Sequence, residues 1–191
     1  MNKSTGKTLI LVEGALMIAL ATILSTLTIG NLPYGGSISL EMIPLVLMAF
    51  RHGTKWGVFT AFTHSVLSMI LGFSNVMYCP TLLSQIGCIL LDYIIAFTAL
   101  GLAKWFADLC GGKLVGGAIG TLIVCLIRFV CSFLSGALLL GAYMPDTFEN
   151  VWVYSLVYNG SYMLPNTIIT VVAAVILMKT MPKFFGGKKT A

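Results

Sequence analysis

The sequence predicts an all-α integral membrane protein with six transmembrane helices and both termini in the cytoplasm. Three observations lead to this fold class. First, 58% of the 191 residues are hydrophobic and only 9% are charged, whereas a soluble domain has about 25% charged residues. Second, long apolar stretches recur along the chain with no polar block of domain size between them. Third, the Lys and Arg residues cluster in alternate loops, the pattern typical of membrane proteins.

Six apolar stretches are expected to form the helices of one membrane domain covering residues 1–191. A helix of about 20 residues crosses the roughly 30 Å hydrocarbon core of a bilayer. The expected spans lie at about 9–29, 37–51, 55–72, 81–104, 113–141 and 152–179. The second stretch is short for a full crossing, which favours a preceding loop that enters the membrane.

The first stretch, LILVEGALMIALATILSTLTIG, is interpreted as a span rather than a signal peptide. It is too long for a signal-peptide core and it contains Glu13. Within it, ALMIA places Ala15 and Ala19 four residues apart, and the start of the fifth stretch repeats this small-residue spacing with glycines. Such spacing allows close helix packing in membranes. It serves either internal packing or docking of another membrane subunit.

The basic residues set the expected orientation. Ten of the eleven Lys and Arg residues lie before the first stretch, after the sixth, or in the turns that follow the second and fourth. They are Lys3, Lys7, Arg51, Lys55, Lys104, Lys113, Lys179, Lys183, Lys188 and Lys189. The opposite loops, NLPYGGS, GFSNVMYCP and GAYMPDTFEN, contain no Lys or Arg. By the positive-inside rule both termini are cytoplasmic, so the net charge of +5 reflects topology rather than nucleic-acid binding.

Three charged residues fall inside the predicted spans. Glu41 lies early in the second, Asp92 in the middle of the fourth and Arg128 in the middle of the fifth. Each costs about 2.5–3.5 kcal/mol at the centre of a membrane helix on insertion scales. An ion pair between Arg128 and one carboxylate, most simply Glu41, offsets part of this cost. Asp92 then remains for a cationic or amine-bearing ligand.

Polar and aromatic residues near these charges predict a ligand cavity. Ser132 and Ser135 follow Arg128 at helical spacing, which makes a polar stripe on the fifth span. The sixth span carries tyrosines at positions 154, 158 and 162, with Asn159 and Asn166 on an adjoining face. Tyrosine rings stack on flat ligands, and Asn and Asp fix a ligand edge by hydrogen bonds. This combination suits a polar heteroaromatic ligand bound near the outer ends of spans four to six.

No motif indicates catalysis, a metal site or a bound cofactor. The five cysteines lack metal-ligand spacing. The two histidines, His52 and His64, have no acid or nucleophile frame around them in the sequence. The prediction is therefore a protein that is not an enzyme and has no cofactor.

Four stretches of the chain resemble a known family. They are LVEGALMIALATILS, LPYGGSISLEMIPLVLMAFRHGTKWG, LDYIIAFTALGLA and YSLVYNGSYMLPN. In this order they resemble the thiamine-specific S component of energy-coupling factor (ECF) transporters, from about residue 9 to residue 185. The resemblance implies six helices in a prokaryotic plasma membrane, an outward-facing vitamin site and no ATPase activity of its own. It also implies docking on a transmembrane T subunit that carries two ATPase subunits, through Ala15 and Ala19.

The resemblance also implies roles for individual residues. The binding acid of the family, usually glutamate, falls on Asp92, its tyrosine neighbour on Tyr93, and the tyrosine and asparagine of the last helix on Tyr154 and Asn159. The structural acid–base pair of the family falls on Glu41 and Arg128, the pair that the membrane cost also favours.

Two positions differ from the family pattern. Ser132 stands where the family tends to have histidine, and Leu140 where it has a tryptophan that stacks on the ligand. Ser132 is nevertheless counted among the substrate-binding residues.

The loop NLPYGGS, with its paired glycines, is expected to gate the site. Its Tyr34 is also counted among the substrate-binding residues.

The sequence therefore predicts the substrate-binding subunit of an ECF vitamin importer, with thiamine as the leading substrate. Three alternatives stay open. The first is an S component for another vitamin or for a thiamine precursor. The second is a self-sufficient secondary carrier that uses Asp92 as a proton or cation site, and the third is a structural membrane scaffold, for which Asp92→Asn and Asn159→Ala would change no binding assay. Inverted repeats would favour a carrier, and the sequence shows none.

Overall fold

The computed structural model describes residues 3–31, 36–112, 114–182 and 184–185 of the chain. These residues form a helical bundle with one short two-stranded sheet. The elements are α1 (Lys3–Thr26), β1 (Gly30–Asn31), β2 (Ser37–Ile38), α2 (Met42–His52), α3 (Thr54–Leu71), α4 (Phe73–Val76), α5 (Leu82–Cys88), the π-helix η2 (Ile89–Ile95), α6 (Ala96–Thr98), the 3-10 helix η3 (Ala99–Leu102), α7 (Ala103–Leu109), α8 (Leu114–Leu139), the 3-10 helix η4 (Gly141–Tyr143) and α9 (Val151–Thr180).

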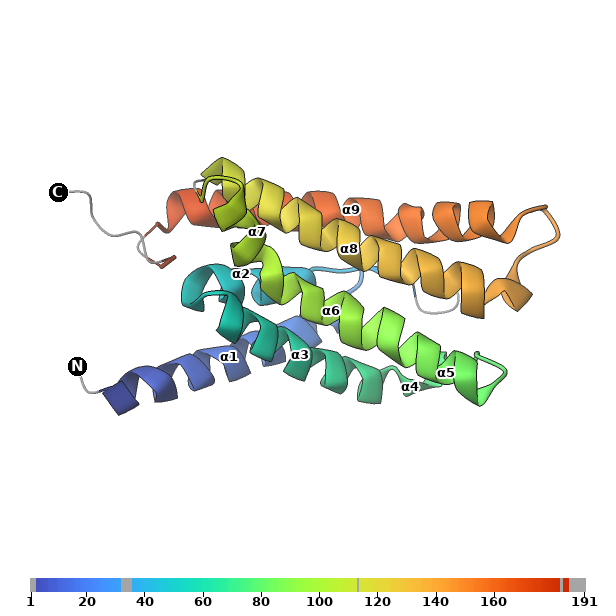
Figure 1. The fold of residues 1–191 in the computed structure, drawn as a ribbon, viewed down its shortest axis with the longest axis horizontal. Helices are drawn as coiled ribbons and strands as arrows, with labels where there is room; N and C mark the ends of the chain where they lie inside the picture. The colour runs from blue at the N-terminus through green and yellow to red at the C-terminus, as the bar shows by residue number, and fades with distance from the viewer. Residues whose placement is uncertain (1–2, 32–35, 113, 183, 186–191) are drawn as a thin grey trace.

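The long helices run roughly along the long axis of the molecule (Figure 1). The start of α1 and the end of α9 lie at the same end of the bundle, whereas the α4–α5 and α8–α9 connections lie at the other end. The two ends of the bundle therefore carry different loops.

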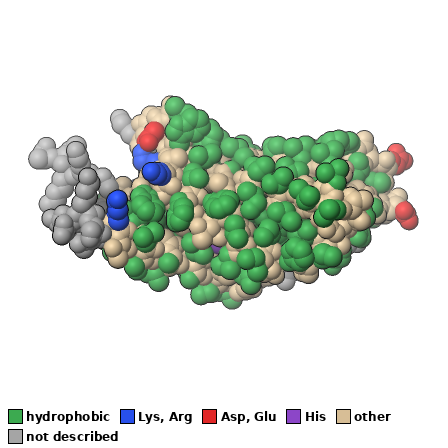
Figure 2. All heavy atoms as spheres, turned by 60° about the horizontal axis from the view of Figure 1, so that its bottom comes forward, with side chains coloured by type: hydrophobic (Ala, Val, Ile, Leu, Met, Phe, Trp, Pro, Cys, Tyr) green, Lys and Arg blue, Asp and Glu red, His purple; other side chains and the backbone are tan. Residues whose placement is uncertain are grey.

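Four helical stretches are long and apolar enough to cross a membrane. They are Gly6–Thr26, Leu82–Leu109, Leu114–Leu139 and Val151–Thr180, and α2 is a shorter apolar helix. Large apolar side chains on these helices face outward, with Leu16 63%, Val115 70% and Leu164 63% exposed. Figure 2 shows hydrophobic side chains over the middle of one face and charged side chains at its ends. A helical surface of this kind is solvated by lipid rather than by water.

The second predicted stretch begins differently from the expected 37–51. Ser37 and Ile38 form β2 and pair antiparallel with β1, with Gly30 opposite Ile38 and Asn31 opposite Ser37. The helix α2 therefore begins only at Met42. The chain enters α2 through an extended segment, not through a longer helix.

The helix expected at 81–104 is continuous from Leu82 to Leu109 but irregular. Its middle is the π-helix η2, and it tightens to a 3-10 turn in η3. Near this turn it crosses α3 with backbones in close contact. A Cβ atom on Gly57 would lie 2.8 Å from the Gly101 carbonyl oxygen, and one on Gly101 would lie 2.4 Å from the Val58 nitrogen. Only glycine fits this crossing.

The two small-residue patterns have different surroundings. Gly116 and Gly120 on α8 pack against α7, where added Cβ atoms would lie 2.6 Å and 2.4 Å from the carbonyl oxygens of Ala107 and Ala103. These glycines therefore serve internal packing. Ala15 and Ala19 on α1, in contrast, are exposed at the surface of the bundle.

One polar cluster fastens α1 to α2. The Arg51 guanidinium donates to the Glu13 carboxylate from Nε over 2.6 Å and from Nη2 over 2.5 Å, and His52 also pairs with Glu13. Arg51 Nη1 donates to the Phe184 carbonyl oxygen over 2.8 Å, and the guanidinium lies 3.7 Å from the Phe184 ring centroid. Glu13 is thus a structural partner within the bundle.

Candidate functional site

A cavity of about 370 Å³ lies among the ends of α1, α3 and α4, the segment before α2, η2, α8 and α9. This volume falls within the usual range of small-molecule sites. Most sequence-predicted residues line it: Glu41, Asp92, Tyr93, Arg128, Ser132, Leu140, Tyr154 and Asn159. Tyr34 lies outside the described residues. The fold therefore gathers residues from six separate parts of the chain around one cavity.

Asp92 reaches the cavity from the π-helix η2. A π-helix is rare and often marks a functional site, since the wider turn redirects its side chains. The Asp92 Oδ2 atom accepts hydrogen bonds from the Ser135 hydroxyl on α8 and, over 3.4 Å, from the Cys88 thiol. These neutral donors orient the carboxylate but do not cancel its charge.

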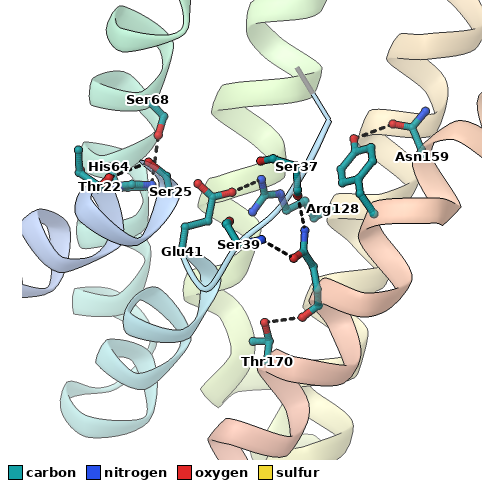
Figure 3. A network of polar contacts seen from close by, with 12 residues as sticks. Thr22, Ser25, Ser37, Ser39, Glu41, His64, Ser68, Arg128, Asn159 and Thr170 are labelled. Carbon is teal, nitrogen blue, oxygen red and sulfur yellow. Dashed lines mark hydrogen bonds and ion pairs between the residues drawn. The ribbon is translucent and has the colours of Figure 1, made fainter. Parts of the chain in front are cut away.

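The formal charges of the described cavity-wall residues sum to −1. Arg128 Nη2 donates to Glu41 Oε1 over 2.7 Å (Figure 3), and the guanidinium lies 3.9 Å from the Phe97 ring centroid. Within the part of the chain that the structure describes, the ion pairs leave Asp92 without a cationic partner. The charged residues described in the cavity wall are thus one paired acid, its base and Asp92. Such a site favours a ligand that carries one positive charge.

Three tyrosines of α9 form an aromatic wall. The Tyr158 ring centroid lies 5.8 Å from that of Tyr154 and 5.9 Å from that of Tyr162. Asn159 is held among them, because its Nδ2 donates to the Ser155 carbonyl oxygen over 2.9 Å and its Oδ1 accepts from the Tyr162 hydroxyl over 2.7 Å. These hydrogen bonds orient Asn159 and Tyr162 within the wall.

Tyr93 and Ser132 complete the surroundings of Asp92. The Tyr93 hydroxyl donates to the Gly72 carbonyl oxygen over 2.9 Å, which ties η2 to the end of α3. Ser132 is buried on α8 and lines the cavity together with Asp92. Because the Tyr93 hydroxyl donates its proton to Gly72, Tyr93 offers the cavity its ring and a hydroxyl oxygen that can accept a hydrogen bond.

Several wall residues could not be identified from the sequence. Ser25 and Thr26 come from the end of α1, and Asn75 comes from α4. The Gly36 amide donates to the Tyr158 hydroxyl over 3.1 Å, and a Cβ atom on Gly36 would lie 2.9 Å from that oxygen. In the sequence, the paired glycines of the loop could have indicated that the backbone at Gly36 approaches another side chain closely. The neutral residues at helix ends carry no comparable signal.

Comparisons with known proteins identify similar proteins over nearly the whole chain. The model of a family described as thiamine transporter protein (Thia_YuaJ) matches residues 11–186. The thiamine transporter ThiT of Bacillus subtilis is 35% identical over 191 residues, which cover 94% of this chain and 95% of that protein. ThiT of Lacticaseibacillus paracasei is 31% identical over 157 residues, covering 77% and 75%. A solved structure of ThiT from Listeria monocytogenes matches with a TM-score of 0.73 and 26% identity, covering 94% of this chain and 98% of that one.

Proposed function

The chain belongs to the thiamine transporter protein family, and on this premise we propose that it is the substrate-binding S component of an ECF importer that takes up thiamine. The family is one of transporters rather than enzymes, and the chain is a multi-pass protein of the cell membrane.

The excess negative charge in the cavity is the observation that carries the choice of substrate. Thiamine is a monocation that joins an aminopyrimidine to a thiazolium ring. Asp92 and Asn159 hold the aminopyrimidine edge, because a carboxylate accepts from the amine and an amide completes the pattern. Tyr154 and Tyr93 contact the rings, and the cationic thiazolium gains from aromatic faces. Ser132 and Tyr34 complete the proposed binding set.

The arrangement of the helices and the position of the cavity support a six-span topology with both termini in the cytoplasm. The helices α2 and α3 supply the two spans beyond the four long apolar stretches. The cavity is lined by the last residues of α1, by the end of α3 and by the first half of α9. It therefore lies away from the end at which α1 starts and α9 finishes (Figure 1). With the basic end inside the cell, the cavity faces outward.

Import requires partners that supply energy. We assign this role to a T subunit with two ATPase subunits, docked through the exposed Ala15 and Ala19 of α1. Small residues allow another helix to approach closely. The subunit captures its ligand outside and releases it inward after docking on the ATP-driven module.

Titration calorimetry of the purified protein in detergent tests the proposed substrate. We expect sub-micromolar binding of thiamine by the wild type. Asp92→Asn keeps the shape and the acceptor for Ser135 but removes the charge. A hydrogen bond to a charged group contributes about 1.5–3 kcal/mol, so the dissociation constant should rise about 10- to 100-fold. Asp108→Asn is the control, because this carboxylate pairs with Lys104 at the surface.

A panel of riboflavin, pyridoxine and hydroxymethylpyrimidine separates the alternatives. Binding of one of these compounds without binding of thiamine would keep the S-component class and replace the substrate. Uptake into vesicles that lack the ATPase subunits, driven by a proton gradient and lost in Asp92→Asn, would instead identify a secondary carrier. Equal thiamine binding by the wild type and Asp92→Asn would contradict the proposed site.

A further inference from the structure

A short segment, residues 36–41, is held against α9 by one buried asparagine. Asn166 Oδ1 accepts from the Ser39 amide over 2.9 Å, and Asn166 Nδ2 donates to the Ser37 carbonyl oxygen over 2.9 Å. The bonds at Ser37 and Ser39 are drawn in Figure 3. The Asn166 side chain is only 2% exposed. A single amide group thus binds the segment as a neighbouring strand would.

Asn166 supplies the backbone hydrogen bonds on one side of the segment. Its other neighbour is β1, which pairs with Ser37 and Ile38. On that side the Ile29 amide donates to the Ile38 carbonyl oxygen over 2.9 Å. Ser39 is buried, so its amide has little access to water. A buried backbone group without a partner costs as much as a lost hydrogen bond, and Asn166 removes that cost for the Ser39 amide.

Both ends of the segment belong to the cavity wall. At one end the Gly36 amide donates to Tyr158, and at the other Glu41 binds Arg128. Among the described residues, those that line the cavity include Gly36, Ser37 and Glu41 but not Asn166. Asn166 therefore does not line the cavity itself, whereas the segment that it holds does.

We propose that Asn166 is a positioning residue for ligand binding. It fixes the middle of the segment 36–41, so that Gly36 and Glu41 keep their places in the wall and a bound ligand leaves slowly. The part of this inference that concerns the ligand rests on the proposed function. The part that concerns the segment does not.

Hydrogen exchange of the ligand-free protein in detergent, followed by mass spectrometry, tests the positioning directly. In Asn166→Ala the amides of residues 36–41 should exchange about tenfold faster or more, because two hydrogen bonds are lost. Asn166→Leu restores the lost volume without the hydrogen bonds and should give the same result. Thr170→Val is the matched control. It removes the 2.7 Å bond from Thr170 Oγ1 to the Asn166 carbonyl oxygen on the same face of α9 and leaves the segment untouched.

The second measurement is the rate of thiamine dissociation. In both Asn166 variants it should rise about tenfold, with the association rate changed less than about threefold, and Thr170→Val should match the wild type. Unchanged exchange in the segment, or equally faster exchange throughout the protein, would overturn the inference. So would an unchanged dissociation rate. If the wild type itself fails to bind thiamine, the proposed function fails, and the exchange data still decide whether Asn166 positions the segment.

Discussion

Arg128 on α8 and Glu41, at the start of α2, form an ion pair with a distance of 2.7 Å between Nη2 and Oε1. Their side chains are 10% and 11% exposed. A buried ion pair contributes little net free energy of folding, but removing one partner leaves the other charge buried and uncompensated, which costs much more. The pair therefore fixes the start of α2 relative to α8 in the wall of the cavity.

Glu41→Gln should destabilise the protein strongly, because it leaves the Arg128 charge buried without a partner. Breaking such a pair typically costs about 3–5 kcal/mol. The double variant Glu41→Leu with Arg128→Met removes both charges and should regain most of that loss. The thermal unfolding midpoint in detergent, measured without ligand, compares the variants. Asp108→Asn breaks an exposed pair and serves as the control. Equal losses in the single and double variants would show that the charge pairing is not the cause.

Much of the helical arrangement could be predicted because lipid requires long apolar helices. The helices α8 and α9 run close to the ranges 113–141 and 152–179. The β1–β2 pair and the π-helix η2 could not be predicted. The sequence around η2, GCILLDYIIAF, is uniformly apolar apart from Asp92. A change of one residue in helical register leaves no trace in such a pattern, because packing against neighbouring helices decides it.

The charged residues of the candidate site could be identified from the sequence for a physical reason. Glu41, Asp92 and Arg128 are expensive in a membrane, so each one asks for a partner. Asn75 and Asn166 carry no charge, and uncharged polar residues occur in membrane helices as ordinary packing groups. The role of Asn166 depends on which backbone it meets, and only the folded chain shows that the carbonyl of Ser37 and the amide of Ser39 lie beside it.

Leu140→Trp should strengthen the binding of an aromatic ligand. Leu140 lines the cavity just after the end of α8. In the pattern of the thiamine-specific S components that the sequence resembles, a tryptophan that stacks on the ligand stands at this position. A stacked aromatic pair contributes about 0.5–1.5 kcal/mol beyond the area that it buries. The dissociation constant for thiamine should therefore fall about two- to tenfold, as titration calorimetry would measure.

The matched control for this substitution is Leu138→Trp. Leu138 lies on the same helix but is 61% exposed and faces away from the cavity. It should leave the affinity unchanged. If Leu140→Trp left the affinity as unchanged as Leu138→Trp does, no ring of the ligand would lie beside residue 140, and the proposed pose would have to change.

The exposed alanines of α1 allow binding and transport to be separated. Ala15→Leu with Ala19→Leu adds bulk on the outer surface of the bundle, away from the cavity. Close helix approach needs small residues, so docking should fail while thiamine binding in detergent stays at the wild-type level. Uptake by cells that also express the T and ATPase subunits should fall by at least about tenfold. Thr63→Leu, at an exposed position on α3, should keep full uptake. Normal uptake by the α1 variant would exclude this face as the docking surface, whereas lost binding would show that α1 shapes the cavity.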